Sequence, residues 1–418
     1  MTLHLKDARV LLYSHDTFGL GHLRRCRAIA EALVEEISGL QVLIISGAPI
    51  AGAFDWRARV DFVKIPSVIK LRNGEYTSLA EHVDLSDTLR MRRSIILETA
   101  RSFAPDVFIV DKEPMGLHDE VEPALAWLKA RGRTRLVLGL RDVMDGPGLL
   151  AREWQRKNLM PRIERYFDEV WVYGPQGFHD PLEGLEVPLS LARRIRFVGF
   201  LKRRAYGVAA PPTTPPYLVA TAGGGGDGFE MLGCVIAAYR RRPDLPLPAV
   251  VVLGPYMPAE QRRALQAAAA DMQRLRVIEF SPRMEDLMAG AEAVVCMSGY
   301  NTWCEVLSFD KPALLVPRTE PREEQLIRAR RAAALNAATM LMPDQAADPD
   351  LMAEAIRALS LQPPPSIGYP HPDLGGLATI CGIVGEWLSG QARRGNAGRA
   401  GGAAGGPEGA GIAPGPCP

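Results

Sequence analysis

The sequence predicts two Rossmann-like, doubly wound α/β domains that face each other across a cleft. Its 418 residues exceed what one ordinary core accommodates. In each half, short apolar runs alternate with amphipathic stretches, which is typical of parallel sheets covered by helices. A proline-rich break, PPTTPP at residues 211–216, separates the halves. Together these three observations predict the fold class.

Changes in composition set the expected boundaries. Residues 1–200 form the first predicted domain, residues 201–216 a stiff proline-rich linker and residues 217–389 the second domain. Residues 390–418 are rich in Gly, Ala and Pro and almost free of large apolar residues. Such a segment cannot bury a core, so we expect it to be a disordered tail.

In the first half, apolar runs predict buried strands, and apolar residues repeating every three or four positions predict helices. The predicted strands are residues 10–14, 42–46, 62–66, 107–111, 136–140 and 170–173, and the clearest predicted helices are residues 23–36 and 85–103. Short strands separated by helices favour a parallel sheet.

The second half repeats the pattern after the linker. Its predicted strands are residues 217–221, 250–253, 277–280, 294–297 and 313–316, followed by a last amphipathic helix at 374–388. Ligands of such sheets bind at the carboxyl ends of the strands. The loops that follow the strands are therefore the places to look for a site.

Charge and cysteine usage narrow the class of protein. Lys and Arg total 49 against 48 Asp and Glu, a net charge of +1, which argues against a nucleic-acid partner held by bulk charge. No stretch reaches the ~18 apolar residues of a membrane span, and no secretory signal precedes the first strand. The six cysteines form no CxxC pair, which disfavours a metal or redox site. We expect a cytoplasmic protein, with peripheral membrane contact left open.

The first candidate site is HDTFGLGH at residues 15–22, between a strand and a helix. Gly19 and Gly21 permit a tight turn, and the helix N-terminus that follows favours an anion or a sugar oxygen. This places His22 at the tip of the turn, although a histidine that merely caps the helix is equally compatible. Arg24, in the first helical turn, is a candidate contact for an anion. The pattern lacks the third glycine of a dinucleotide fingerprint and the Lys-Ser/Thr of a P-loop.

The second candidate site is TAGGGGDG at residues 221–228, after the first strand of the second half. Consecutive glycines offer backbone N–H groups to a diphosphate. The candidate residues are Gly223, Gly224, Gly225 and Gly226. Asp227 is expected to N-cap the helix or to point away from the phosphates.

The third candidate site follows the strand at 294–297. Its residues are Ser298, Gly299, Asn301, Thr302 and Glu305. Glu305 falls one turn into a helix, where a carboxylate can accept both hydroxyls of a ribose; the alternative is a solvated glutamate stabilised by the helix dipole. Farther on, Arg318, Glu324 and Gln325 suit a phosphate and sugar hydroxyls, or else form an exposed charged turn.

These motifs, in this order, resemble those of nucleotide-sugar glycosyltransferases of the B fold (GT-B), family 28 type, which includes the peptidoglycan N-acetylglucosaminyltransferase and its predicted-glycosyltransferase relatives. Residues 19–33 (GLGHLRRCRAIAEAL) also resemble the start of the nucleotide-sugar hydrolase of pseudaminic acid synthesis. The resemblance spans residues 10–388. It implies an acceptor-side first domain, a nucleotide-sugar-binding second domain, a ribose-binding Glu305 and a sugar-reading pair, Glu324 and Gln325. The first loop departs from the family's glycine-dense GGTGGH.

The resemblance implies an inverting hexosyltransferase that moves a hexose or amino sugar from a nucleoside-diphosphate sugar, expected to be UDP-linked, to an acceptor hydroxyl. No acidic DxD pair stands at a strand end, so we expect backbone N–H groups and Arg318 to hold the diphosphate without a metal or other cofactor. His22 is the expected base, and Asp111 or Asp142 orients or replaces it.

Two alternatives keep the same residues. In a nucleotide-sugar hydrolase His22 would activate water instead of an acceptor hydroxyl. A non-catalytic sugar-nucleotide-binding subunit would be expected to lose His22 or Glu305, and both are present. The polar segment at residues 72–86 favours a sizeable acceptor over water.

Overall fold

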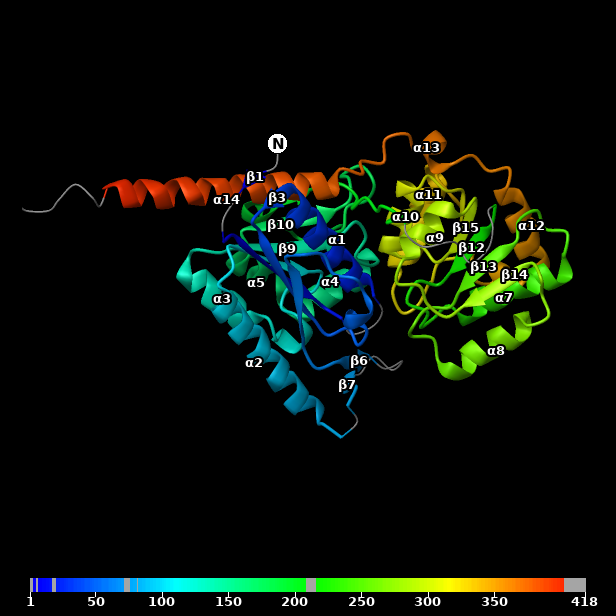
Figure 1. The fold of residues 1–418 in the computed structure, drawn as a ribbon, viewed down its shortest axis with the longest axis horizontal. Helices are drawn as coiled ribbons and strands as arrows, with labels where there is room; N and C mark the ends of the chain where they lie inside the picture. The colour runs from blue at the N-terminus through cyan, green and yellow to red at the C-terminus, as the bar shows by residue number, and fades with distance from the viewer. Residues whose placement is uncertain are drawn as a thin grey trace, which may run out of the picture.

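The computed structural model describes residues 3–4, 7–16, 20–70, 76–80, 82–207 and 216–401. These residues form two α/β domains, each built around one parallel sheet, and a long last helix (Figure 1). The strands come from the apolar runs and the helices from the amphipathic stretches between them. The predicted fold class of two doubly wound α/β domains is confirmed.

The first domain contains a seven-stranded parallel sheet in the order β11-β10-β9-β8-β2-β4-β5. Its strands are β2 (Arg9–Ser14), β4 (Gln41–Ser46), β5 (Val60–Lys64), β8 (Val107–Asp111), β9 (Arg135–Arg141), β10 (Glu169–Tyr173) and β11 (Ile195–Phe197). Each of the six predicted strands overlaps one of these. β11 was not predicted, because this short edge strand buries none of its residues fully and leaves no apolar run.

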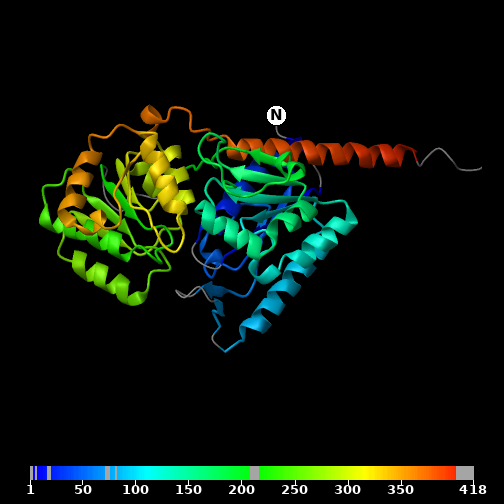
Figure 2. The same ribbon diagram turned by 180° about the vertical axis from the view of Figure 1, so that it is seen from behind.

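Helices cover both faces of this sheet (Figures 1 and 2). They are α1 (Gly21–Glu36), α2 (Leu85–Phe103), α3 (Glu122–Arg131), α4 (Pro147–Arg156), α5 (Leu159–Tyr166) and the short α6 (Leu189–Ala192). The bounds of α2 equal the prediction. Two small additions were not predicted: a parallel pair of β1 (Leu3–His4) with β3 (Ile37–Ser38), and an antiparallel pair of β6 (Val68–Lys70) with β7 (Tyr76–Ser78).

The second domain contains a six-stranded parallel sheet in the order β14-β13-β12-β15-β16-β17. Its strands are β12 (Leu218–Thr221), β13 (Ala249–Val252), β14 (Leu275–Ile278), β15 (Ala293–Cys296), β16 (Ala313–Leu315) and β17 (Thr339–Met340). Its helices are α7 (Phe229–Arg241), α8 (Ala259–Ala269), α9 (Met284–Gly290), α10 (Tyr300–Ser308), α11 (Glu324–Ala334), α12 (Pro349–Leu359) and α13 (Pro365–Gly368).

The chain crosses between the domains twice at one place. Leu201, on the way out, forms an antiparallel bridge with Gly375, on the way back, and Phe200 N–H donates to the carbonyl of Asp373 at 2.8 Å. The chain leaving the first domain at Phe200 and Leu201 is therefore hydrogen-bonded to the chain that returns to it at Asp373 and Gly375. Of the predicted linker 201–216, residues 208–215 lie outside the described part of the chain.

The last helix, α14 (Gly376–Gly401), returns to the first domain and packs along α1 (Figure 1). The indole of Trp387 stacks on that of Trp171 in β10, with ring centroids 5.8 Å apart. We predicted that the second domain extends to residue 389. The structure places its end before α14, because α14 packs on the first domain. The tail predicted as disordered from residue 390 is helical to Gly401, and residues 402–418 lie outside the described part.

Each sheet has a point where the strand order reverses. In the first sheet β2 lies between β4 and β8, and in the second β12 lies between β13 and β15. Crevices at such points, beyond the carboxyl ends of the strands, are the usual ligand sites of these sheets. The loops after β2, β8, β12 and β15 carry the predicted motifs.

Among the helices that the structure describes, none combines the length and apolar character needed to traverse a bilayer.

Candidate active site

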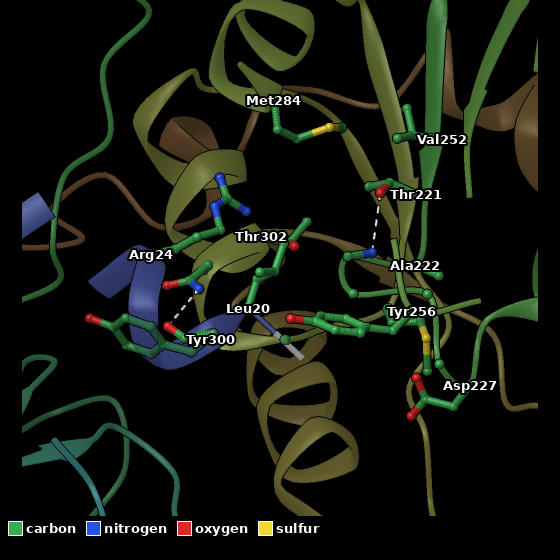
Figure 3. Close-up of a pocket in the computed structure, with 18 of the residues that line it drawn as sticks. Leu20, Arg24, Thr221, Ala222, Asp227, Val252, Tyr256, Met284, Tyr300 and Thr302 are labelled. Carbon is green, nitrogen blue, oxygen red and sulfur yellow. Dashed lines mark hydrogen bonds between the residues drawn. The ribbon is translucent and has the colours of Figure 1, made fainter. Parts of the chain in front are cut away.

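A cleft of about 180 Å³ lies between the domains at the carboxyl ends of both sheets (Figure 3). From the first domain, the start of α1 and Arg141 line it. The predicted donor-site residues that line it are Gly223, Gly224, Gly225, Gly226, Gly299, Asn301, Thr302, Arg318, Glu324 and Gln325. Ser298 and Glu305 are fully buried behind this wall. The predicted motifs of the second domain therefore meet in one place.

His22 and Asp111 form a close pair at the switch point of the first sheet. Nδ1 of His22, in the first turn of α1, lies 2.6 Å from Oδ2 of Asp111, the last residue of β8. Arg25 donates two further hydrogen bonds to the same carboxylate, at 3.0 and 2.6 Å. Since an ionised carboxylate only accepts, Nδ1 of His22 carries the proton and Nε2 is left as the acceptor. This is the arrangement of a general base held by an orienting carboxylate.

The protonation states of this pair suit base catalysis. Burial lowers the pKa of His22 to about 4, and the hydrogen bond to Asp111 opposes that shift without cancelling it. Burial alone would raise the pKa of Asp111, but the charge of Arg25 and the hydrogen bond from His22 hold it well below its usual range. At neutral pH the imidazole is therefore neutral and the carboxylate ionised.

Asp16 ties the start of α1, which carries His22, to the end of β4. Asp16 accepts hydrogen bonds from the backbone N–H of Leu23 at 3.2 Å and from the hydroxyl of Ser46 at 2.6 Å. Predicted Gly19 lies outside the described residues. A Cβ added to Gly21 would meet its neighbours only at ordinary contact distances, so the fold does not require a glycine there.

The loop after β12 does require its glycines. Gly223 and Gly225 have φ values of +66° and +87°, and a Cβ on Gly225 would lie 2.3 Å from the carbonyl oxygen of Leu253. A Cβ on Gly254, in the facing loop, would lie 2.7 Å from the carbonyl oxygen of Gly223. A side chain at Gly225 or Gly254 would therefore clash with the backbone of the other loop, so the close approach of the two loops requires glycine at both positions. The result is a bare stretch of backbone on the cleft wall.

Arg318 is the centre of the polar groups beside the glycine loop. Its guanidinium donates to Asp227 at 2.8 Å and to Glu324 at 2.6 Å, and its backbone N–H donates to the side chain of Gln325 at 3.0 Å. Asp227 thus pairs with Arg318 instead of capping α7, whose N-cap is Gly228. The prediction of an Asp227 cap is wrong, because the ion pair holds its side chain.

The first turn of α10 contacts the first domain directly. Asn301 donates to the carbonyl of Gly21 at 3.0 Å and accepts from Arg203 at 2.7 Å. Ser298 donates to the backbone carbonyl of Gln325 at 2.6 Å, so its hydroxyl orders the start of α11. Of the predicted residues in this segment, Gly299, Asn301 and Thr302 reach the cleft.

Glu305 is buried one turn farther into α10. Its Oε1 pairs with Arg24 of the first domain, which also bonds Glu285 at 2.7 Å. Its Oε2 is buried and finds no partner among the described residues. Burial raises the pKa of Glu305, and the charge of Arg24 opposes this. Arg24, predicted to contact an anion, instead joins two carboxylates of the second domain.

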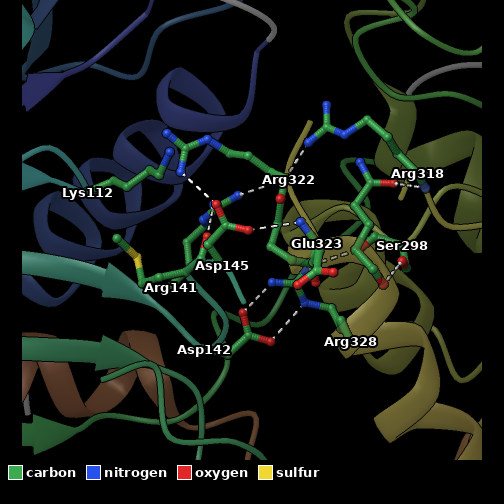
Figure 4. A network of polar contacts seen from close by, with 12 residues as sticks. Lys112, Arg141, Asp142, Asp145, Ser298, Arg318, Arg322, Glu323 and Arg328 are labelled. Carbon is green, nitrogen blue, oxygen red and sulfur yellow. Dashed lines mark hydrogen bonds and ion pairs between the residues drawn. The ribbon is translucent and has the colours of Figure 1, made fainter. Parts of the chain in front are cut away.

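A second set of ion pairs joins the domains on the other side of the cleft (Figure 4). Arg328 of α11 donates to both oxygens of Asp142, at 2.9 and 2.6 Å, and both side chains are fully buried. Nearby, Arg322 bonds Asp145 at 3.0 Å. Asp142 was predicted as an alternative orienting group for His22, and this is wrong, because its carboxylate is committed to Arg328.

Three arginines that organise this site were not predicted. Arg25 holds Asp111, Arg203 holds Asn301, and Arg328 holds Asp142. Each lies beside other basic residues that are less buried, so its burial left no signal in the pattern. Among the described residues, no group of three or more His, Cys, Asp or Glu side chains is arranged to hold a metal ion.

Comparisons with known proteins agree with this geometry. Residues 224–366 match the glycosyltransferase family 28 C-terminal domain, within the second domain. A search of curated proteins found no match. Solved structures that resemble the chain include the calicheamicin glycosyltransferase CalG4 (16% identity, TM-score 0.58, covering 91% of this chain and 98% of that chain). Another is the glycosyltransferase of kitacinnamycin, with 13% identity and a TM-score of 0.60, covering 93% of this chain and 100% of that chain. A third is MurG of Acinetobacter baumannii, with 14% identity and a TM-score of 0.54, covering 91% of this chain and 99% of that chain. The chain therefore has the GT-B fold of these solved glycosyltransferases, and its second domain matches the C-terminal domain of glycosyltransferase family 28 over residues 224–366.

Proposed function

We propose that this glycosyltransferase moves a hexose or amino sugar from a nucleoside-diphosphate sugar to an acceptor hydroxyl, with inversion and without a metal ion. One observation carries the proposal. The His22–Asp111 pair lies at the switch point of the first sheet, directly behind Gly21 and Arg25, which line the interdomain cleft, and the glycine loop with Arg318 lines the opposite wall. A base on one side and an anion site on the other are the two parts that direct displacement needs.

His22 is the proposed base. In this scheme Nε2 takes the proton of the acceptor hydroxyl, whose oxygen bonds to the anomeric carbon as the bond to the nucleoside diphosphate breaks. Asp111 stabilises the imidazolium that forms, because its short hydrogen bond to Nδ1 strengthens as charge develops. A single displacement of this kind inverts the anomeric centre.

The leaving diphosphate is proposed to lie on the glycine loop. Backbone N–H groups at residues 223–226 and the start of α10 supply fixed positive potential there. Arg318 adds a full charge, and its two carboxylate partners, Asp227 and Glu324, keep it extended toward the loop. These groups do for the diphosphate what a metal ion does in other sugar transferases.

The nucleoside and sugar are proposed to bind along α10 and α11. Glu305 has one buried oxygen without a partner, which suits a ribose hydroxyl, and Arg24 covers its other oxygen until the nucleotide enters. Glu324 and Gln325, at the start of α11, are the proposed contacts of the sugar hydroxyls. A UDP-linked donor is the expectation.

Product analysis tests the proposal. The enzyme is first screened by thermal shift against nucleoside diphosphates and their sugars, and then incubated with each binder and a panel of acceptor alcohols. A glycosylated acceptor of inverted configuration, formed equally well in EDTA, is the expected product. Free sugar released without any acceptor would identify the nucleotide-sugar hydrolase instead. Loss of transfer in EDTA that Mg²⁺ or Mn²⁺ restores would overturn the metal-free mechanism.

A further inference from the structure

Two cations near the proposed base have their closest carboxylates at 3.4 Å and 4.0 Å. Lys112 directly follows Asp111, and Arg141 ends the neighbouring strand β9. The side chains are about nine-tenths buried, with 13% and 12% of their surface exposed. Figure 4 shows both extending into the network of polar side chains between the domains. They come from the first domain, on the side of the cleft that carries His22.

The nearest carboxylates are too distant or already engaged. Nζ of Lys112 lies 3.4 Å from Glu113, and Nη1 of Arg141 lies 4.0 Å from Glu324, both longer than a well-formed charged hydrogen bond. Glu113 is shared with Lys157 at 3.7 Å. Glu324 is bonded to Arg318 at 2.6 Å. Lys157 also has Glu153 at 2.7 Å, and Arg318 also has Asp227 at 2.8 Å, whereas Lys112 and Arg141 have only these longer contacts with a carboxylate among the described residues.

Further observations show that this arrangement of cations is unfavourable. Nε of Arg141 is buried without a hydrogen-bond partner among the described residues. Lys112 has φ of +68°, a left-handed conformation that is uncommon for a residue with a side chain. Burial lowers the pKa of Lys112 to about 8, and the charge of Arg141 adds to this shift. Burial likewise lowers the pKa of Arg141 to about 10, and the charges of Arg25 and Arg328 add to it.

An anion in contact with Lys112 and Arg141 would relieve the electrostatic part of this cost. It would supply a closer counter-charge to both cations and an acceptor for the unpaired Nε of Arg141. We propose that Lys112 and Arg141 form a subsite for an anionic group of the acceptor, a carboxylate or a phosphate, next to the hydroxyl that His22 deprotonates. This proposal rests on the proposed sugar transfer and adds the chemical class of its acceptor.

The position favours the acceptor over the donor as the source of the anion. Lys112 is adjacent in sequence to the orienting carboxylate of the base, and its charge is felt at His22. The donor diphosphate has its own proposed groups in the second domain, at the glycine loop and Arg318. Arg141 also lines the cleft near Glu324 and Gln325, so an anionic donor sugar is the competing source that an experiment must separate.

Binding of sulfate to the whole enzyme gives the first test. Sulfate is titrated calorimetrically into the wild type, Lys112→Met and Arg141→Met, each saturated with UDP to fill the donor site, and into the control Arg156→Met, an exposed arginine of α4. We expect each cleft variant to weaken sulfate binding roughly ten- to a hundredfold and the control to leave it unchanged. Equal affinity in all four proteins, or displacement of sulfate by UDP, would overturn the subsite.

Folding of the variants provides an independent check. Lys112→Met removes a buried charge that the fold disfavours, so its melting temperature is expected to equal or exceed that of the wild type. A clear fall in melting temperature would show that Lys112 is a structural partner of Glu113 and would count against the subsite. Arg141→Lys keeps the charge and is expected to retain part of the sulfate affinity.

Transfer assays identify the source of the anion. Acceptors are compared in matched pairs, a glycoside with its uronate and an alcohol with its phosphate monoester. We expect the variants to lose kcat/KM selectively for the anionic member of each pair. Loss confined to UDP-glucuronate relative to UDP-glucose would assign the anion to the donor sugar and overturn the acceptor assignment. If no nucleotide sugar binds at all, the proposed function fails, while sulfate titrations without UDP still report on the two cations.

Discussion

Arg24 and Glu305 form an ion pair that joins the first turn of α1 in one domain to α10 in the other. The carboxylate proposed to hold the donor ribose is thus already occupied on one oxygen in the empty enzyme. Glu285 is the second carboxylate on Arg24, at 2.7 Å, and it does not line the cleft. Variants of Glu305 and Glu285 both remove a partner of Arg24, but only those of Glu305 would also remove the proposed ribose contact.

Glu305→Gln is expected to weaken UDP binding by about tenfold or more. Hydrogen bonds to a charged group are worth about 1.5–3 kcal/mol each, and the amide keeps the shape while losing the charge. Titration calorimetry measures the effect, and Glu285→Gln serves as the control because it removes the other partner of Arg24. Equal losses in both variants would show that Glu305 acts through Arg24 and does not contact the ribose.

His22→Ala is expected to lower the rate of transfer by about 10²–10⁴-fold, the usual cost of removing a positioned base. UDP affinity is expected to stay near the wild-type value, because the proposed donor contacts lie in the second domain. Asp111→Asn should give a smaller loss in rate, since it leaves the imidazole in place without its orienting charge. Replacement of the exposed His371 is the matched control; turnover of His22→Ala at the wild-type rate would remove histidine from the mechanism.

The rate of transfer is expected to fall on the acid side of its pH profile. Burial lowers the pKa of His22 to about 4 in the folded enzyme. Above that pH the imidazole is neutral and can accept a proton; as the pH falls through about 4, protonation removes the base. The profile of kcat/KM should therefore stay level from neutral pH down to about pH 5. A midpoint near 6.5, the ordinary value for histidine, would mean that His22 is solvated in the working enzyme.

The pattern of apolar runs predicted the strands that end at the site, because buried parallel strands are continuous apolar segments. The strand predicted at residues 107–111 has the same bounds in the structure, where Asp111 is its last residue. The glycine loop was found for a related reason: left-handed backbone at Gly223 and Gly225 requires that residue type. Each of these features is encoded locally.

Contacts between the domains were not predictable in the same way. Asp142 and Arg328 are 186 residues apart, and nothing local distinguishes Arg328 from its exposed neighbours. The same holds for Arg24, whose partners lie in α9 and α10. The helix beyond residue 390 was missed because its Gly- and Ala-rich composition carries no amphipathic pattern; its apolar contacts come earlier, at Trp387.

Removal of α14 tests where the first domain ends. A chain ending at Gly390 keeps Trp387 and the buried Leu388, so we expect its melting temperature to match that of the full chain. A chain ending at Gly375 loses the packing of α14 on α1 and the stacking on Trp171, and should melt at a markedly lower temperature. Equal melting temperatures for all three chains would show that α14 contributes nothing to the first domain.

The buried pair of Asp142 and Arg328 makes the relative position of the domains sensitive to a single charge. Asp142→Ala leaves the guanidinium of Arg328 fully buried, with only the carbonyls of Ser298 and Glu324 as partners among the described residues. Breaking one side of such a pair typically costs about 3–5 kcal/mol, because the remaining charge is neither solvated nor paired.

Chemical denaturation of Asp142→Ala measures this cost, with Asp271→Ala as the matched control. Asp271 pairs with Arg240 on the surface, where both side chains are more than half exposed, and such pairs contribute at most about 1 kcal/mol. The double variant Asp142→Leu with Arg328→Met removes both charges and should recover most of the lost stability. If the single variant at Asp142 costs no more than the control, the domains are held by their apolar contacts and the pair is not what fixes the width of the cleft.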